Sequence, residues 1–368
     1  MSSISKIIVK IGSSLITKEG LGLDFDALES WIRQIAQIKN QNKEVILVSS
    51  GAIASGCKTL GWVTKPKGIH ELQAAAAVGQ MELIHAYEIL FRSHSLHTAQ
   101  ILLTHDDLVD RTRYLNARST LKTLLSHQVV PIINENDTVA TNEIRLGDND
   151  TLGALVTNLV DADLLIILTD QIGLFTGDPR HEKDAALIKE AKANDVFLTK
   201  AASRVGGKFG IGGMYTKVMA ARRAALSGAN TIIACGYEKD ILIRLINGES
   251  VGTKLLADTN KIAARKRWLA DQLVPAGQLV LDVGAVKAIC VDKKSLLPVG
   301  ILSVQGNFVR GDLVACINEN KKEVARGLIN YSASEAKIMV GCSTELIGNS
   351  GVHLIEPEMI HRDNMIIL

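Results

Sequence analysis

The feature that most constrains the fold is an alternation of short aliphatic runs with longer segments of helical periodicity. Over the first two thirds of the chain, six such runs are predicted to form buried strands: Ile7–Ile11, Val45–Ser49, Ala99–Leu103, Val129–Ile133, Leu164–Leu168 and Thr231–Ala234. Most of their residues are apolar, without the alternation in polarity of a half-exposed strand, which is typical of parallel strands covered on both faces. The pattern therefore predicts a doubly wound α/β domain.

The segments between these runs carry helix signals. After the first run, Asp24 can cap a helix whose apolar side chains share one face: Phe25, Leu28, Ile32, Ile35 and Ile38. Further helices are predicted over Glu71–Phe91, Leu115–Ser126, Leu152–Leu159 and Met214–Leu226. Strand and helix thus follow each other as a parallel sheet with crossover helices requires.

The pattern changes near residue 260. The segment 260–272 is charged and leads to Pro275, and beyond it short β-like runs are separated by glycine and asparagine turns. We therefore predict a first domain over 1–262, a linker over 263–274 and a small β-rich domain over 275–368. The length of 368 residues agrees with two domains.

Composition excludes several classes of protein. The 41 Lys and Arg nearly balance the 39 Asp and Glu, and this charge balance argues against a protein that coats a polyanion. Five dispersed cysteines form no Cys-x-x-Cys pair, which predicts buried thiols in a reducing compartment. No apolar run approaches the ~20 residues that span a bilayer, and Lys6 and Lys10 interrupt any signal-peptide core. We expect a cytoplasmic protein without a membrane segment.

Two lysines stand at strand–helix turns of the predicted sheet. Lys10 ends the first strand just before Gly12, and Lys217 follows a loop with five glycines between 206 and 213 and opens a helix. Glycine loops and helix starts can bind phosphate, and phosphoryl transfer needs cations on the moving group. The alternatives are an ion pair for Lys10 and a solvent-exposed position for Lys217. Ligands are expected at this edge, where the carboxyl ends of the strands meet.

Small polar side chains follow the other predicted strands. Carboxylates and amides at 134–150 could hold an ammonium group, bind Mg²⁺ through water or position lysines: Asn134, Asp137, Asp148, Asn149 and Asp150. Capping of the next helix is an equally natural role for Asp148 or Asp150. Ser49, Ser50 and Gly51 could bind a carboxylate through hydroxyl and backbone donors. Neither a histidine metal motif nor a Ser-His-Asp arrangement is indicated.

Longer motifs carry a specific resemblance. The runs IIVKIGSSL, ILVSSGAIASG, AAVGQ, PIINENDTVATNEIRLGDNDTLGALV, LLIILTDQIGLFTGDPR and GGMYTK occur in the order and spacing of glutamate 5-kinases, members of the amino acid kinase superfamily. The C-terminal segment from GQLVLDVGA to GNFVRGDLV resembles a PUA domain. The resemblance implies a three-layer α/β/α sandwich with a mainly parallel sheet, followed by a small β-rich PUA domain.

The resemblance also implies an activity and its residues. The activity is ATP-dependent phosphorylation of the γ-carboxylate of L-glutamate to L-glutamyl 5-phosphate, the first step of proline biosynthesis, with Mg²⁺ carried mainly by the ATP phosphates. Catalysis would rest on Lys10, Lys217 and Asp150. The glutamate-binding residues would be Ser50, Gly51, Asn134, Asp137, Asp148 and Asn149. The ATP-binding residues would be Lys10, Thr169, Asp170, Ile211, Gly212, Gly213, Met214, Tyr215, Thr216 and Lys217.

The family further implies feedback inhibition by proline, a homo-oligomer and functional coupling to glutamyl-phosphate reductase. Two alternatives stay open. A sister kinase would act on another substrate, such as aspartate, and an RNA-binding protein would use the PUA domain. From 275 to 368 the chain has nine Lys and Arg, ten Asp and Glu, and only Phe308 and Tyr331 as aromatics. Such a domain is poorly suited to RNA, so we expect no RNA partner.

Overall fold

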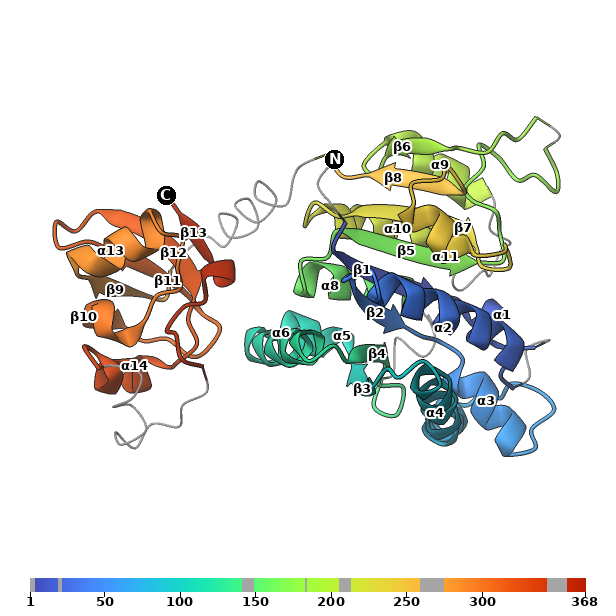
Figure 1. The fold of residues 1–368 in the computed structure, drawn as a ribbon, viewed down its shortest axis with the longest axis horizontal. Coiled ribbons are helices and arrows are strands. Elements are labelled where there is room, and N and C mark those ends of the chain that lie inside the picture. The colour runs from blue at the N-terminus through green and yellow to red at the C-terminus, as the bar shows by residue number, and fades with distance from the viewer. Residues whose placement is uncertain are drawn as a thin grey trace. The chain divides into compact units, whose positions relative to one another are not determined.

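The computed structural model describes residues 4–18, 22–140, 149–182, 184–204, 213–258, 275–342 and 356–368. The chain divides into two units, Met1–Val109 with Asn116–Lys261 and Asp110–Leu115 with Ile262–Leu368. Each is taken by itself below (Figure 1). The predicted linker over 263–274 lies outside the described residues. The domain limits drawn from the sequence therefore stay a prediction.

The first unit is built on an eight-stranded sheet in the order β3-β4-β2-β1-β5-β7-β8-β6. The strands are β1 (Lys6–Ile11), β2 (Glu44–Val48), β3 (Thr98–Leu103), β4 (Val130–Glu135), β5 (Leu164–Thr169), β6 (Glu190–Lys192), β7 (Asn230–Cys235) and β8 (Thr253–Leu256). Neighbours pair in parallel except for β7 with β8. The six predicted strands are confirmed to within two residues at each end, whereas the short strands β8 and β6 at one end of the sheet were not predicted.

Helices cover both faces of this sheet. They are α1 (Ser13–Ile16), α2 (Phe25–Lys39), α3 (Ala52–Thr59), α4 (Ile69–Arg92), α5 (His105–Val109), α6 (Arg111–Ser126), α8 (Asn149–Leu159), α9 (Val196–Arg204), α10 (Met214–Ala225) and α11 (Ile241–Ile246). The predicted cap of α2 is confirmed, because the Asp24 carboxylate accepts a hydrogen bond from the Ala27 amide. Helix α2 packs against α4 and α11, while α8 and α10 pack together on β1, β5 and β7 (Figure 1). The three-layer α/β/α fold is confirmed.

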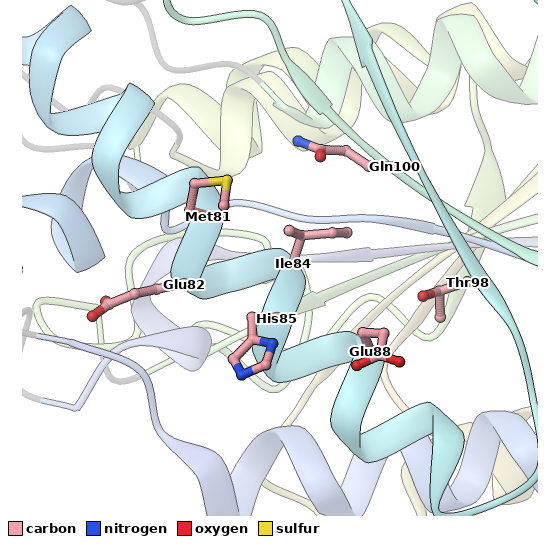
Figure 2. A pocket seen from close by; sticks show the side chains of 7 residues that line it. All are labelled: Met81, Glu82, Ile84, His85, Glu88, Thr98 and Gln100. Carbon is pink, nitrogen blue, oxygen red and sulfur yellow. The ribbon is translucent and has the colours of Figure 1, made fainter.

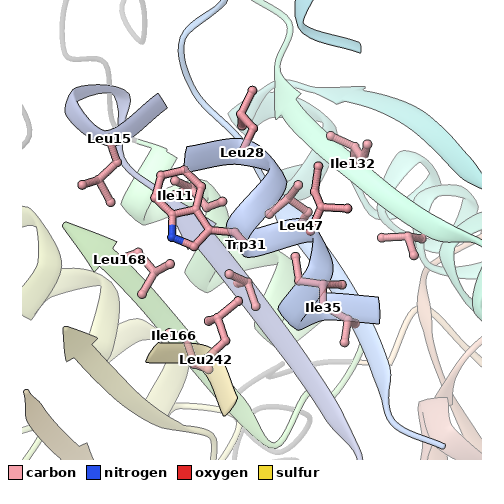
Figure 3. Packing of buried hydrophobic residues seen from close by; sticks show 14 of the residues in the cluster. Ile11, Leu15, Leu28, Trp31, Ile35, Leu47, Ile132, Ile166, Leu168 and Leu242 are labelled. Atoms are coloured by element: carbon pink, nitrogen blue, oxygen red, sulfur yellow. The ribbon is translucent and has the colours of Figure 1, made fainter. Parts of the chain in front are cut away.

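Aliphatic side chains and one tryptophan fill the layer between the sheet and α2 (Figure 3). Trp31 is 2% exposed, and its indole nitrogen donates to the Gly236 carbonyl oxygen at 2.9 Å. Side chains of a strand alternate between faces, so Val9 and Ile11 of β1 enter this core. Lys10 between them therefore lies on the opposite face, toward α8 and α10.

Helices α3 and α4 approach each other at two glycines. A Cβ atom added to Gly56 would lie 1.8 Å from the Ala75 carbonyl oxygen, and one added to Gly79 would lie 1.9 Å from that of Ala52. Both atoms belong to the backbone of the neighbouring helix and cannot rotate away. The close contact therefore requires glycine at both positions and fixes α4 against the turn that follows β2.

The second unit contains a five-stranded sheet in the order β10-β9-β11-β12-β13. Its elements are β9 (Gly277–Leu281), α13 (Val283–Cys290), β10 (Ile301–Gly306), β11 (Leu313–Ile317), β12 (Glu323–Leu328), α14 (Ala333–Met339) and β13 (Met365–Ile367). Phe308 and Tyr331 are both buried in its core, so neither is available as a stacking platform for a nucleobase. The predicted small β-rich domain is confirmed.

The composition led to predictions about the cysteines and about membrane-spanning segments. All five cysteines are free thiols, three of them buried. Within the described ranges, every helix is too short or too polar to cross a bilayer.

The α3–α4 contact predicts the effect of a single methyl group. We expect Gly79→Ala to lower the free energy of unfolding by about 3 kcal/mol or more, because one of two backbones must move. Gly153→Ala is the matched control: its Cβ would meet Lys10 Cβ at 3.5 Å, an ordinary contact inside α8. Urea unfolding measures both, and equal losses in the two variants would contradict this account.

Candidate active site

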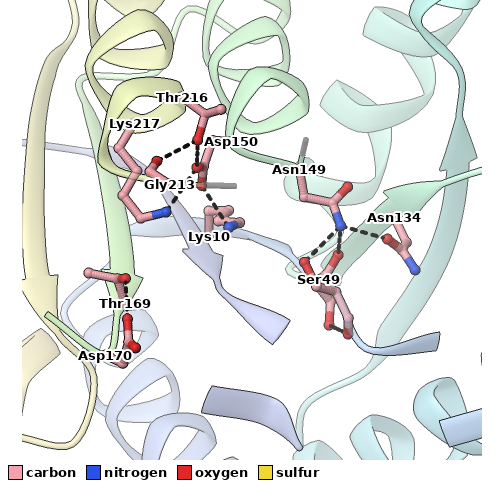
Figure 4. A network of polar contacts seen from close by, with 11 residues as sticks. Lys10, Ser49, Asn134, Asn149, Asp150, Thr169, Asp170, Gly213, Thr216 and Lys217 are labelled. Atoms are coloured by element: carbon pink, nitrogen blue, oxygen red, sulfur yellow. Dashed lines mark hydrogen bonds and ion pairs between the residues drawn. The ribbon is translucent and has the colours of Figure 1, made fainter. Parts of the chain in front are cut away.

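Two lysines and one aspartate form a buried cluster at the carboxyl edge of the sheet (Figure 4). Lys10 comes from β1, Asp150 from the first turn of α8 and Lys217 from the first turn of α10. The Asp150 carboxylate lies 2.6 Å from Lys10 Nζ and 3.0 Å from Lys217 Nζ. The three residues are 6%, 1% and 5% exposed, respectively. The fold therefore brings together three residues that were predicted from the sequence.

The structure decides between the roles that the sequence left open for these residues. Lys10 does form an ion pair, and its partner is Asp150. The exposed position considered for Lys217 is wrong, because α10 packs against α8 and buries it. Asp150 lies within α8, and its carboxylate faces the lysines and accepts from the Thr216 hydroxyl at 2.8 Å. Asp150 therefore orders the two lysines.

Within this cluster, two lysine side chains face one carboxylate. Burial acts to raise the pKa of Asp150, but the charges of Lys10 and Lys217 and the Thr216 hydrogen bond outweigh it and hold the pKa well below its usual value. Asp150 is thus an anion throughout the physiological range. Two ammonium groups against one carboxylate give an excess cation in a buried site, which favours an anionic ligand.

Next to this cluster lies a group of amides and hydroxyls. Asn149 Nδ2 donates to the Ser49 carbonyl oxygen at 2.9 Å, to Ser50 Oγ at 2.8 Å and to Asn134 Oδ1 at 3.1 Å (Figure 4). These residues follow β2, end β4 and begin α8. Gly51 begins α3 with φ 99°, a left-handed conformation that favours glycine. Of the predicted amide side, Asn134 and Asn149 are thus brought together, beside Ser49 and Ser50.

Asp137 is a titratable residue that the sequence also predicted for this side of the site. It is half-buried in the turn after β4. Burial raises the pKa of its carboxyl to about 6, against the opposing charge of Lys65. An ammonium group that binds beside such a carboxyl favours its ionised form and lowers its pKa. Asp137 is therefore suited to holding a cationic group of a ligand.

Other predicted residues lie along the ends of β5 and α10. Thr169 is buried and its hydroxyl donates to Asp170 Oδ1 at 3.1 Å, at the end of β5. Gly213 caps α10, and its carbonyl oxygen accepts from Thr216 Oγ1 at 2.7 Å. Met214 is buried, whereas Tyr215 is exposed. Asp148, Ile211 and Gly212 lie outside the described residues.

Two contacts of the amide group come from α4, which sequence reasoning did not place at the site. Gln80 Oε1 accepts from Asn134 Nδ2 at 2.8 Å, and the Tyr87 hydroxyl lies 2.8 Å from Ser49 Oγ. The motif AAVGQ, which ends at Gln80, was the available signal.

A groove of about 590 Å³ lies elsewhere, between α4 and the edge strand β3 (Figure 2). Its lining residues are Met81, Glu82, Ile84, His85, Glu88, Thr98 and Gln100. None of them belongs to the predicted site. Nor, in the part of the chain that the structure describes, do three His, Cys, Asp or Glu side chains converge as metal ligands.

Comparisons with known proteins agree with this geometry. Residues 5–235 match the model of the amino acid kinase family, and residues 277–347 match the PUA domain. A glutamate 5-kinase of Chromobacterium violaceum is 60% identical over 99% of this chain and 98% of its own length. The chain belongs to the amino acid kinase family, among the glutamate 5-kinases. A glutamate 5-kinase of Nitrosospira multiformis, 58% identical with the same coverage, supports this membership.

Proposed function

We propose that this glutamate 5-kinase transfers the γ-phosphoryl group of ATP to the γ-carboxylate of L-glutamate, the first step of proline biosynthesis. The observation that carries the proposal is the buried cluster of Lys10, Asp150 and Lys217 with its excess positive charge. It lies between the amide group after β2 and β4 and the turns after β5 and before α10. The first would hold the acceptor and the second the nucleotide.

The proposed chemistry needs no general base. The γ-carboxylate of glutamate has an ordinary pKa of about 4.3, so it is already a nucleophile at neutral pH. The barrier is the approach of this anion to a triphosphate, which Lys10 and Lys217 would lower by neutralising charge on the moving group. Asp150 holds both ammonium groups in place and, because its pKa is low, takes up no proton during the transfer.

Substrate binding is proposed for the residues around these lysines. Asn149 directs its amide nitrogen to Ser49, Ser50 and Asn134, and its carbonyl oxygen would accept from a donor on glutamate. Asp137 would accept the glutamate ammonium group, and Gly51 and Asp148 complete the proposed acceptor site.

The nucleotide would use Thr169, Asp170 and the segment from Ile211 to Lys217. The start of α10 at Gly213 presents backbone amides and a positive dipole end to phosphate groups. The Asp150 carboxylate already pairs with both lysines and is therefore a poor candidate for a Mg²⁺ ligand. This agrees with the proposal that Mg²⁺ is carried mainly by the ATP phosphates. Bound Mg²⁺ would supply further charge neutralisation on these phosphates.

The family supports the remaining proposals. These are feedback inhibition by proline, assembly into a homo-oligomer, functional coupling to glutamyl-phosphate reductase and a cytoplasmic location. For the PUA domain we propose a structural or regulatory role without RNA, on the basis of its charge balance and its buried aromatics.

A hydroxamate assay tests the proposed reaction. The acyl phosphate product reacts with hydroxylamine, so we expect ATP-dependent hydroxamate formation with L-glutamate and little with L-aspartate. Adding proline to the same assay tests feedback inhibition. Activity with aspartate but not with glutamate would overturn the proposed substrate.

The lysine cluster predicts large losses of turnover. We expect Lys10→Ala and Lys217→Ala to lower kcat by about 10²-fold or more, because each removes a cation from the transferring group. Lys192→Ala is the control: this lysine is 71% exposed and pairs only loosely with Asp258 at the far edge of the sheet. Circular dichroism checks folding. Normal turnover in either cluster variant would remove that lysine from the mechanism.

The raised pKa of Asp137 predicts a pH dependence of glutamate binding. The carboxyl is protonated below its pKa of about 6 and then no longer attracts an ammonium group. We expect the KM for glutamate to rise by up to about tenfold per pH unit as the pH falls below 6. In Asp137→Asn the KM should be higher overall and nearly flat between about pH 5 and pH 7. The same inflection in both would assign it to another group.

A further inference from the structure

We propose that Gln80 is a positioning residue that helps to hold the orientation of the Asn134 amide and, through it, that of the acceptor site. The inference rests on the proposed function, since it assumes that the amide group around Asn149 holds glutamate. It adds a residue on α4, outside the turns at the carboxyl edge of the sheet.

The carboxamide of Asn134 has two different sides, and Gln80 contacts the nitrogen side while Asn149 and the Glu135 amide contact the oxygen side. Its nitrogen donates to Gln80 Oε1 at 2.8 Å, while its oxygen accepts from Asn149 Nδ2 at 3.1 Å and from the Glu135 amide at 2.9 Å. Asn134 is only 2% exposed, so bulk water gives little help to an unpaired group there. Rotating the amide by half a turn would place its nitrogen against two donors.

The orientation is passed on to the proposed acceptor site. Because Asn134 presents oxygen, Asn149 Nδ2 can donate to it while also donating to Ser50 Oγ at 2.8 Å. The connected side chains thus come from α4, β4, α8 and the turn after β2. Loss of Gln80 would therefore leave the orientation of Asn149 and Ser50 less well defined.

Helix α4 is held in the position that this role requires. Gly79, next to Gln80, lies against the backbone of α3 at Ala52, immediately after the Ser50 turn. Tyr87 is seven residues beyond Gln80 and therefore on the same side of the helix, where its hydroxyl contacts Ser49 Oγ. One face of α4 thus contacts both Asn134 of β4 and Ser49 in the turn after β2.

The test compares Gln80→Leu with a matched change on the same helix. Leucine is similar in size but cannot accept from Asn134, so we expect the KM for glutamate to rise about tenfold, the effect of one lost hydrogen bond to a buried amide. The KM for ATP and kcat should change by less than about twofold, because the lysine cluster is untouched. Gln73→Leu is the control, since it removes a comparable hydrogen bond of α4, the one from Gln73 Nε2 to the Ala140 carbonyl oxygen at 3.1 Å.

A double-mutant cycle asks whether the effect passes through Asn134. In an Asn134→Ala background, Gln80→Leu should change glutamate affinity, measured by titration calorimetry, by less than about twofold. An undiminished further loss there, an equal rise in KM for Gln73→Leu, or an unchanged KM in Gln80→Leu would each overturn the proposal. Wild-type enzyme without glutamate-dependent hydroxamate formation would overturn the proposed function itself, and this inference with it.

Discussion

The ionised Asp150 carboxylate between Lys10 and Lys217 is the interaction on which the functional edge depends. Three elements far apart in sequence meet there, and each supplies one charged side chain. Desolvating any one of them alone would cost more than a small domain can offset, so the three are stable only together. The cluster also constrains β1: a slip of one residue would turn Lys10 into the aliphatic layer under α2.

The rest of the first unit supports this edge from two directions. On one face of the sheet, α8 and α10 pack together and deliver Asp150 and Lys217. Near the amide group around Asn149, the close glycine contact between α3 and α4 holds the segment that follows β2. The positions of the polar side chains after β2 therefore depend on a helix contact that requires glycine at 56 and 79.

Much of this fold could be predicted from the sequence, because its signals are local. Continuous aliphatic runs predicted the strands β1 to β5 and β7, and Asp24 predicted the start of α2. Lys10 and Lys217 were found because a lysine at a strand end or helix start needs a special partner. The edge strand β6 was missed for a physical reason: Glu190–Lys192 is short and polar, and such a strand forms only beside its neighbour β8.

Other features depend on contacts between distant residues. The pairing of Gln80 with Asn134 joins residues 54 positions apart, and no periodicity signals it. The role of Asp150 was ambiguous for the same reason, since a carboxylate at a helix start can cap or pair, and only the positions of β1 and α10 decide. Gly56 and Gly79 likewise resemble ordinary helix glycines until the two helices are placed together.

The position of β1 in the sheet has a consequence for how such a chain can diversify. The proposed acceptor side is built mainly from β2, α3, α4 and β4, before β5 in the chain, and the proposed nucleotide side from β5, α10 and their turns. The two sides share little besides Lys10 and α8. Mutation can therefore retune which acid is phosphorylated in one half of the gene while the half that handles the triphosphate is inherited intact.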